Sequence, residues 1–246
     1  MVKSKKKIVK KKTVKRKTRS KKRKIHSSER IPTGIKGLDK LVGGGFLKGS
    51  SILICGGTGT GKTIFCLQFL YEGLKNGESG VYITLEESAR DIIEDGLSIG
   101  IDLREYLKKG KFAIVEHNIF ESTAIDFFIV NKIKASRVVI DPFSLLALSI
   151  EDKPTIRRRL YETIKMLKEM GVTMVLTSEV VGSSESRFSR YSMEEFVVDG
   201  VIKLKFVAVG PQSGRSLLIK KMRRTKHSEE IHPIVIGKGG IRVLNI

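Results

Sequence analysis

One stretch of the chain has residue types and spacing that could hold a phosphate group. It reads G-x-x-x-x-G-K-[ST], the pattern of a phosphate-binding P-loop. Its members are Gly56, Gly57, Thr58, Gly59, Thr60, Gly61, Lys62 and Thr63. The glycines let consecutive backbone N–H groups turn toward a phosphate, which a Cβ atom would obstruct. Lys62 can then reach the β- and γ-phosphates, and the Thr63 hydroxyl can bind Mg²⁺. The pattern predicts a site for ATP or GTP and leaves the choice between them open.

The residues on either side of this loop supply the context that a P-loop requires. Residues 51–55 form an apolar run with strand character, and residues 64–71 have the apolar spacing of a buried helix. A helix that opens at Gly61 adds its positive dipole end to the site, and Ile64 in its first turn is expected to line it. The order of strand, loop and helix favours a phosphate site over a glycine turn that binds nothing.

Three acidic residues at the ends of other predicted strands could complete the site. The apolar segment Arg137–Asp141 ends in a carboxylate, and Asp141 would hold Mg²⁺ directly or through water. Glu86 and Glu87 follow the apolar segment 81–85, and a carboxylate at that edge of a sheet could orient or deprotonate an attacking water. The alternatives are a loop-capping role for Asp141, and a solvated or helix-stabilising pair for the two glutamates.

Predicted strands and helices alternate along the chain. The expected strands cover residues 81–85, 112–115, 137–141 and 173–177, and the expected helices cover 88–98, 124–134 and 155–170. Such alternation predicts an α/β fold with a mostly parallel sheet and helices on both faces. The C-terminal third reads differently, with strands at 201–209 and 215–222 around a turn and a second hairpin over 233–236 and 241–244. These hairpins are expected to extend the sheet in antiparallel fashion.

Charge divides the chain into two parts. The net charge is +21, and residues 1–28 hold 15 of the 47 Lys and Arg but no Asp or Glu. We therefore expect residues 1–30 to be a disordered basic tail and residues 31–246 to be the folded domain. The cations at 3–24 favour a polyanion, either DNA or RNA, bound without sequence preference. An anionic membrane is a less favoured target, and a solvated arm that aids solubility is the alternative. No aromatic residue lies among these cations, so base stacking is not indicated.

Other features limit the functional classes. The chain has two cysteines, Cys55 and Cys66, both at apolar positions that favour core packing. No apolar run approaches the roughly 18 residues of a membrane span, and the N-terminus lacks the apolar region of a secretory signal. The four histidines are not grouped at metal-ligand spacing. These features favour a cytoplasmic protein in a reducing environment.

Several segments together resemble the RecA/KaiC superfamily of ATPases. The segment 33–41, TGIKGLDKL, leads through Gly43, Gly44 and Gly45 to the P-loop. Further matches follow in the family's order at the acidic pair after the second strand and at residues 177–179, 194–201 and 221–227. The resemblance runs from about residue 31 to residue 246. It implies a RecA-like core with ATP as the nucleotide, bound between the subunits of a ring that is usually a hexamer.

The resemblance also assigns roles to particular residues. It implies that Glu86 and Glu87 activate water. It implies that Lys221 and Arg223 project toward the ATP of the neighbouring subunit like an arginine finger, and that His227 lies near that ATP. Without the resemblance, Lys221 and Arg223 would be interpreted as a solvated basic strand end, and His227 as an ordinary surface histidine.

The chain also departs from the family. It holds one such domain where KaiC has two in tandem, and no counterpart of the KaiC autophosphorylation region is found. Thr58 stands where the family often has Pro, and Arg224 where it usually has Gly. The serine-rich segment 182–190, with Arg187, Phe188 and Arg190 beside Glu185, is a weak candidate for DNA contact in a ring channel.

Three functions follow from these observations. The leading interpretation is a single-domain ring ATPase that hydrolyses ATP slowly and engages nucleic acid through its tail. The first alternative is a signalling or motility-complex ATPase that acts on protein partners or at a membrane. The second is a nucleotide-binding scaffold without turnover.

Overall fold

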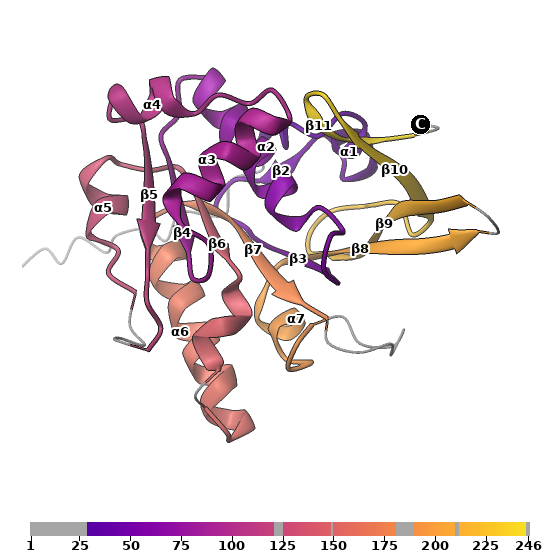
Figure 1. Cartoon of the computed structure of the whole chain (residues 1–246). Helices are drawn as coiled ribbons and strands as arrows, with labels where there is room; N and C mark the ends of the chain where they lie inside the picture. The colour runs from indigo at the N-terminus through magenta and orange to yellow at the C-terminus, as the bar shows by residue number, and fades with distance from the viewer. Residues whose placement is uncertain (1–28, 121–124, 149, 181–188, 210–211, 245–246) are drawn as a thin grey trace, which may run out of the picture.

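The computed structural model describes residues 29–120, 125–148, 150–180, 189–209 and 212–244 (Figure 1). The strands are β1 Arg30–Ile31, β2 Phe46–Leu47, β3 Ser51–Gly56, β4 Gly80–Thr84, β5 Phe112–Glu116, β6 Arg137–Asp141, β7 Thr173–Glu179, β8 Gly200–Val209, β9 Gln212–Met222, β10 Ile231–Gly237 and β11 Gly240–Val243. The helices are α1 Leu38–Leu41, α2 Lys62–Lys75, α3 Ala89–Ser98, α4 Arg104–Lys108, α5 Phe128–Lys132, the 3-10 helix η1 Phe143–Ala147, α6 Lys153–Glu169 and α7 Glu194–Val197.

Nine of these strands form one sheet, in the order β11-β10-β9-β8-β3-β7-β6-β4-β5. The six strands from β8 to β5 pair in parallel, whereas β8, β9, β10 and β11 pair in antiparallel fashion. β3 lies between β7 and β8, and the P-loop follows its last residue. Ligands of such sheets bind outside the carboxyl ends of the strands, so this edge positions the site.

The core has two layers because the parallel strands are covered on both faces. Side chains alternate along β3: Ile52 and Ile54 pack in a cluster with α2, α3 and β11, and Leu53 and Cys55 pack in a cluster with η1 and α6. Figure 1 shows the corresponding arrangement, with α2 and α3 on one side of the sheet and α6 on the other. Both cysteines are buried and unpaired, and burial raises the pKa of each thiol.

The α/β fold with a mostly parallel sheet and antiparallel C-terminal strands is confirmed, and one predicted helix is wrong in length. A helix over 124–134 was expected, but α5 spans Phe128–Lys132, and residues 121–124 lie outside the described residues. The side chain of Asp126 accepts a hydrogen bond from the N–H of Phe128, which fixes the start. Lys134 has a positive φ of 51°, and the chain then turns back, so the helix ends early.

Two of the helices that cover the sheet, α3 and α6, begin at clear capping residues. Ser88 caps α3 through a reciprocal pair of bonds with Asp91, in which each side chain accepts from the other's backbone N–H. Asp152 caps α6 by accepting from the N–H of Thr155, and Pro154 lies in the first turn, where a missing N–H costs nothing. These caps set where each helix starts relative to the sheet.

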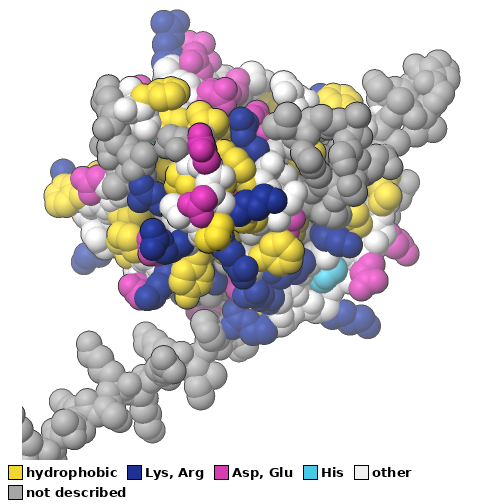
Figure 2. Space-filling view, turned by 90° about the horizontal axis from the view of Figure 1, so that it is seen from below, with side chains coloured by type: hydrophobic (Ala, Val, Ile, Leu, Met, Phe, Trp, Pro, Cys, Tyr) yellow, Lys and Arg dark blue, Asp and Glu magenta, His cyan; other side chains and the backbone are white. Residues whose placement is uncertain are grey.

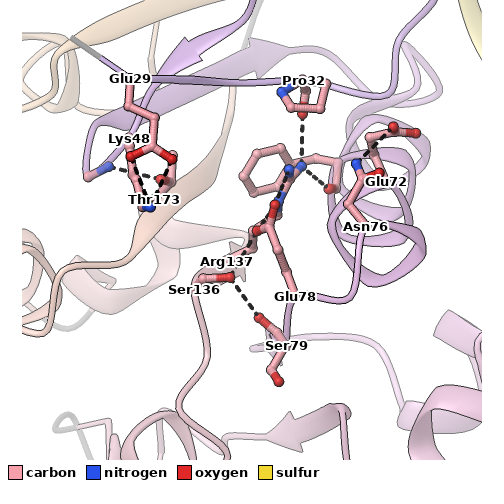
Figure 3. A network of polar contacts seen from close by, with 12 residues as sticks. Glu29, Pro32, Lys48, Glu72, Asn76, Glu78, Ser79, Ser136, Arg137 and Thr173 are labelled. Carbon is pink, nitrogen blue, oxygen red and sulfur yellow. Dashed lines mark hydrogen bonds and ion pairs between the residues drawn. The ribbon is translucent and has the colours of Figure 1, made fainter. Parts of the chain in front are cut away.

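A buried arginine joins the first described residues to the sheet (Figure 3). Arg137, at the start of β6, is fully buried and donates from Nε and Nη2 to both carboxylate oxygens of Glu78, at 2.8 and 2.9 Å. Its Nη1 donates to the carbonyls of Pro32 and Phe69 at 2.9 and 2.8 Å. Burial opposes ionisation of Glu78, but these bonds hold the pKa of its carboxyl below the usual value. A Cβ at Gly73 would lie 2.4 Å from Nε, so glycine is required there.

Candidate nucleotide site

The P-loop is shaped by close contacts at its glycines. Gly61 has a φ of 102° at the N-cap of α2, a conformation that favours glycine. A Cβ at Gly56 would lie 2.5 Å from Oγ1 of Thr60, whose hydroxyl donates to the carbonyl of Gly57 at 2.9 Å. The contact of Thr60 with Gly56 and its hydrogen bond to Gly57 therefore hold the loop in a compact turn just before α2.

Two side chains at the start of α2 face the polar end of the loop. Nζ of Lys62 donates to the carbonyls of Gly56 and Gly57 at 3.1 and 3.0 Å. The hydroxyl of Thr63 donates to Oδ2 of Asp141 at 3.1 Å. The structure thus brings the predicted phosphate-binding lysine and the two predicted Mg²⁺ ligands to one end of the sheet.

Asp141 is held by three hydroxyl groups. Besides Thr63, Tyr82 donates to Oδ2 and Thr177 donates to Oδ1, each at 2.5 Å. The burial of Tyr82 and its proximity to Asp141 raise the pKa of its phenol. These bonds fix the orientation of the carboxylate. Hydroxyl and carboxylate oxygens are the donors that Mg²⁺ prefers, so Thr63 and Asp141 fit that ion.

A cavity of about 450 Å³ opens in front of the loop. This size suits a small-molecule ligand. The predicted site residues that line it are Thr58, Gly59, Gly61, Lys62, Thr63, Ile64, Glu86, Glu87 and Asp141. The remaining P-loop residues, Gly56, Gly57 and Thr60, do not line the cavity. The loop, the metal-binding candidates and the acidic pair therefore share one cavity.

A tight turn after β4 brings the two glutamates to this cavity. The hydroxyl of Thr84 accepts from the N–H of Glu87 at 3.0 Å and donates to the carbonyl of Glu87 at 2.7 Å. Partial burial is the main cause that raises the pKa of Glu87 to about 7. The negative charges of Asp141, Asp95 and Glu86 raise it further, in that order of importance. A carboxyl whose pKa lies near neutrality is suited to accept a proton from water.

Sequence reasoning missed five residues that line the same cavity: Asp95, Pro142, Glu179, Arg215 and Ile236. Arg215 is the most notable, because its Nε donates to the carbonyl of Gly59 at 3.2 Å and its guanidinium lies 4.4 Å from the ring centre of Phe206. Arg215 lies on β9 and Ile236 on β10. No local motif marks them, since their position depends on how the antiparallel strands fold back beside the P-loop.

Lys221 and Arg223 lie at the other end of the sheet. Met222, between them, pairs with Gly200 at the start of β8, and β8 runs parallel to β3. Nζ of Lys221 donates to the carbonyls of Glu195 and Val198 at 2.9 and 2.8 Å, and burial lowers its pKa. The register sets Met222 level with Ile52, and Gly56 follows four residues later in β3. A strand rises about 3.3 Å per residue, so these cations lie about 10 Å or more along the strand direction from their own P-loop, and β9 is two strands away from β3.

The remaining candidate residues do not line the cavity or lie outside the described residues. Nδ1 of His227 lies 2.9 Å from the carbonyl oxygen of Ser228. Arg187 and Phe188 fall outside the described residues, and Arg190 lies 3.5 Å from the carboxylate of Glu179. The basic residues 3–24 also lie outside them. Within the described part of the chain, no helix is both long and apolar enough to cross a membrane.

The sheet order, the P-loop and the strand-end acids define a P-loop nucleotide-binding domain with a RecA-like core. The family model for the KaiC ATPase matches residues 31–246, so the chain belongs to the KaiC ATPase family. The KaiC proteins of this family are longer than this chain, so the alignment covers only part of their length. The circadian clock oscillator protein KaiC of Parasynechococcus marenigrum is 35% identical over 229 residues, which are 87% of this chain and 44% of that protein.

Two further relatives match this chain over nearly their whole length. The UPF0273 protein MK0039 of Methanopyrus kandleri is 35% identical over 236 residues, which cover 87% of this chain and 92% of that protein. The crystal structure of the KaiC-like protein PH0186 from Pyrococcus horikoshii superposes with a TM-score of 0.80 at 43% identity, over 88% of this chain and 99% of that one. The chain thus contains a KaiC-like ATPase-family domain over residues 31–246, and it spans less than half the length of the KaiC protein above.

Proposed function

We propose that this chain hydrolyses ATP slowly, with Mg²⁺, at a site shared between two subunits of a homo-oligomeric ring. We propose that this ring is a hexamer, the usual size in the superfamily that the sequence resembles. The observation that carries the proposal is the single cavity lined by Lys62, Thr63, Asp141, Glu86 and Glu87. These residues provide the parts that phosphoryl transfer to water requires, which are a phosphate clamp, a metal site and a base.

Each residue has a separate task in this proposal. Lys62 leaves its carbonyl partners to contact the β- and γ-phosphates, while the backbone N–H groups of the loop turn toward them. Bound Mg²⁺, held through Thr63 and Asp141, would neutralise developing phosphate charge. Glu87 accepts the proton of the attacking water, and Glu86 beside it raises its basicity.

A second subunit would complete the site. Lys221 and Arg223 lie too far along the sheet to reach the phosphates of their own chain. In a head-to-tail ring the same two cations of the next subunit would meet the γ-phosphate, with His227 close by, and stabilise the charge of the transition state. This arrangement makes hydrolysis depend on assembly.

The basic tail gives the proposal its second part. We propose that the basic tail expected over residues 1–30 lies outside the ATPase domain, with its boundary moved to residue 28 because Arg30 pairs in β1 and donates to the carbonyls of Val42 and Gly45. We propose further that residues 3–24 bind nucleic acid through phosphate contacts in the cytoplasm. The rival function is an ATP-driven switch that acts on a protein partner or at an anionic membrane. In a third possibility, a scaffold, ATP binds without being hydrolysed.

One assay separates these functions. ATPase activity would be measured for the full chain and for a variant lacking residues 1–28, each with and without DNA, RNA or anionic vesicles. Slow Mg²⁺-dependent turnover that nucleic acid stimulates only when the tail is present supports the proposal. Stimulation by vesicles alone supports the membrane switch. The absence of turnover in both proteins, despite ATP binding, supports the scaffold. A Lys62→Ala variant, which should lose ATP binding or turnover, is the control for a contaminating ATPase.

A further inference from the structure

The turn that carries Arg223 is held by contacts with other parts of the fold. The N–H of Arg223 donates to the carbonyl of Asp199 at 2.9 Å. The N–H of Thr225 donates to the carbonyl of Met222 at 3.3 Å, which closes the turn. Arg224 inside the turn has a φ of 57°, a left-handed conformation that is costly for a residue with a side chain and persists where the surrounding structure holds it.

One of the contacts that hold this turn comes from Arg30, which lies 195 residues before Thr225 in the sequence. Nη2 of Arg30 donates to Oγ1 of Thr225 at 3.1 Å. Nη1 of Arg30 donates to the carbonyls of Val42 and Gly45 at 2.9 and 2.8 Å. The guanidinium therefore lies between the glycine-rich turn before β2 and the turn that carries Arg223.

Gly43 lies at the point where these two segments meet. It has a φ of 69°, and a Cβ placed on it would lie 3.6 Å from Cζ of Arg30 and 3.6 Å from Cγ2 of Thr225. A backbone bond joins the same segments close by, since the N–H of Ser228 donates to the carbonyl of Leu41 at 3.0 Å. The first described residues therefore pack directly against the turn after β9.

The contacts of Arg30 use the geometry of an arginine and not only its charge. Arg30 is half-buried, and its three bonds end on two carbonyls and one hydroxyl. Among the described residues, no carboxylate forms an ion pair with it. The rigid fork of a guanidinium can hold oxygens of two segments in fixed directions, which the single ammonium group of a lysine does not. Arg30 therefore fixes the spacing of the two turns.

The direction of the Arg223 side chain depends on the turn that carries it. The side chain is 51% exposed, and its contacts within the subunit are long, at 3.4 Å to the carbonyl of Phe196 and 3.8 Å to the carboxylate of Asp199. Figure 2 shows the end of the molecule that carries α6 and α7, with which Arg223 lines a cavity, and Lys and Arg side chains lie there among hydrophobic ones. Because cations are common on this face, charge alone does not select the one that reaches a neighbouring nucleotide. The position of its backbone must do so.

We propose that Arg30 is a positioning residue for the nucleotide site shared between subunits. Its bond to Thr225 holds the turn so that Arg223 is directed at the nucleotide of the neighbouring subunit. This role rests on the proposed function, which supplies the ring and the action of Arg223 on a second subunit. Arg30 acts through Thr225 and is not itself a catalytic residue. Because a displacement of about 1 Å at a catalytic group can lower a rate about 10²-fold, loss of this bond should lower turnover.

Mixing variants of the full-length protein separates this role from general damage. Arg30→Ala should retain nucleotide affinity, because its own P-loop is intact, and should lower kcat about tenfold or more. Mixed in equal amounts with Lys62→Ala, it should recover activity above either parent, since one subunit then supplies an intact P-loop and the next an intact turn. Mixed with Arg223→Ala, it should not recover, because both variants lack the same half of the shared site.

Two controls keep the failure of this role separate from the failure of the proposed function. Arg223→Ala mixed with Lys62→Ala tests the shared site, and a lack of recovery there would overturn both. If that mixture recovers, the role of Arg30 is overturned when Arg30→Ala fails to recover with Lys62→Ala, or when it recovers with Arg223→Ala. Lys48→Ala removes an exposed cation that pairs with Glu29 beside the same segment, and it should keep full turnover. Equal losses in Lys48→Ala and Arg30→Ala would mean that charge near this segment matters and not the bond, which also overturns the role.

Changes at Thr225 test the bond itself, and they keep the test decisive if Arg30→Ala does not fold. Valine has the shape of threonine without the hydroxyl, so Thr225→Val should lower kcat about fivefold or more, and Thr225→Ser should restore most of it. Arg30→Ala combined with Thr225→Val should be no worse than the more severe single variant, because both remove the same bond. Losses that add in the double variant, or equal activity of Thr225→Val and Thr225→Ser, would overturn the proposal.

Discussion

Thr63 and Asp141 are 78 residues apart in the sequence, and their side chains meet through a hydrogen bond of 3.1 Å from Oγ1 to Oδ2. This bond joins the first turn of α2 to the end of β6. Tyr82 and Thr177 donate to the same carboxylate from the two neighbouring strands. The oxygen ligands expected for Mg²⁺ are therefore set in place by three strands and a helix, without a flexible loop.

Asp141→Asn should reduce Mg²⁺-dependent turnover far more than it reduces Mg²⁺-free nucleotide binding. The amide keeps the size of the carboxylate but removes the negative charge that attracts the ion. Turnover would be followed at several Mg²⁺ concentrations, and nucleotide affinity by calorimetry in the presence of a chelator. An equal loss of both properties would point to misfolding and not to a lost metal ligand.

Glu86→Gln combined with Glu87→Gln should leave ATP bound and stop its hydrolysis. The loss of a general base typically lowers a rate by about 10²–10⁴-fold. Glu94→Gln is the matched control, because Glu94 is an exposed carboxylate on α3 outside the cavity lining. A change in turnover of less than threefold in the double variant would show that the pair is structural.

Glu87 should make the stability of the nucleotide-free protein depend on pH. Its pKa is about 7 in the folded protein against an ordinary value of 4.5, so the folded state retains a proton that the unfolded chain releases. The contribution of Glu87 is fully favourable below pH 4.5 and is lost as the pH rises through 7. Glu87→Gln should therefore raise the melting temperature at pH 8 relative to the unaltered protein, and change it little at pH 5. The same difference at both values would contradict this titration.

Arg223→Ala should retain nucleotide affinity and lose turnover, because its cation is expected to act on the neighbouring subunit. Mixed with Lys62→Ala, it should recover activity above either parent, since some interfaces then combine an intact P-loop with an intact Arg223. Lys226→Ala, a nearby exposed cation, should remain active and serves as the control. A mixture no more active than its parents would argue against a shared site.

A site residue could be predicted from the sequence where its neighbours in the sequence mark it, and not where its position depends on residues far along the chain. The P-loop, Asp141, Glu86 and Glu87 could be found because each follows an apolar strand, and the ends of parallel strands meet at one edge. Arg215 could not be found this way, because its place beside Gly59 depends on the pairing of β9 with β8. Strand register of this kind follows from contacts between distant residues, and a single sequence does not reveal them.

The same reasoning applies to the fold. Alternating apolar strands and helices correctly predicted a parallel sheet, and the turn signals after residue 200 correctly predicted the antiparallel strands. The position of β3 between β7 and β8 was not predictable, since both neighbours lie more than a hundred residues later in the chain. Arg137 was interpreted only as the first residue of a strand. Its full burial could not be predicted, because Glu78 and two backbone carbonyls from other elements compensate its charge.

The bond from Arg137 to Pro32 sets a limit on proteolytic trimming of this protein. Cleavage before residue 29 removes 15 positive charges and none of the partners of Arg137. Cleavage past Pro32 removes a carbonyl that accepts from the buried guanidinium of Arg137, and a buried donor left without its acceptor costs about 1–3 kcal/mol or more when it is charged. One cut before residue 29 would therefore convert the chain from a strongly cationic to a mildly basic form, whereas a cut past Pro32 would also destabilise the folded domain.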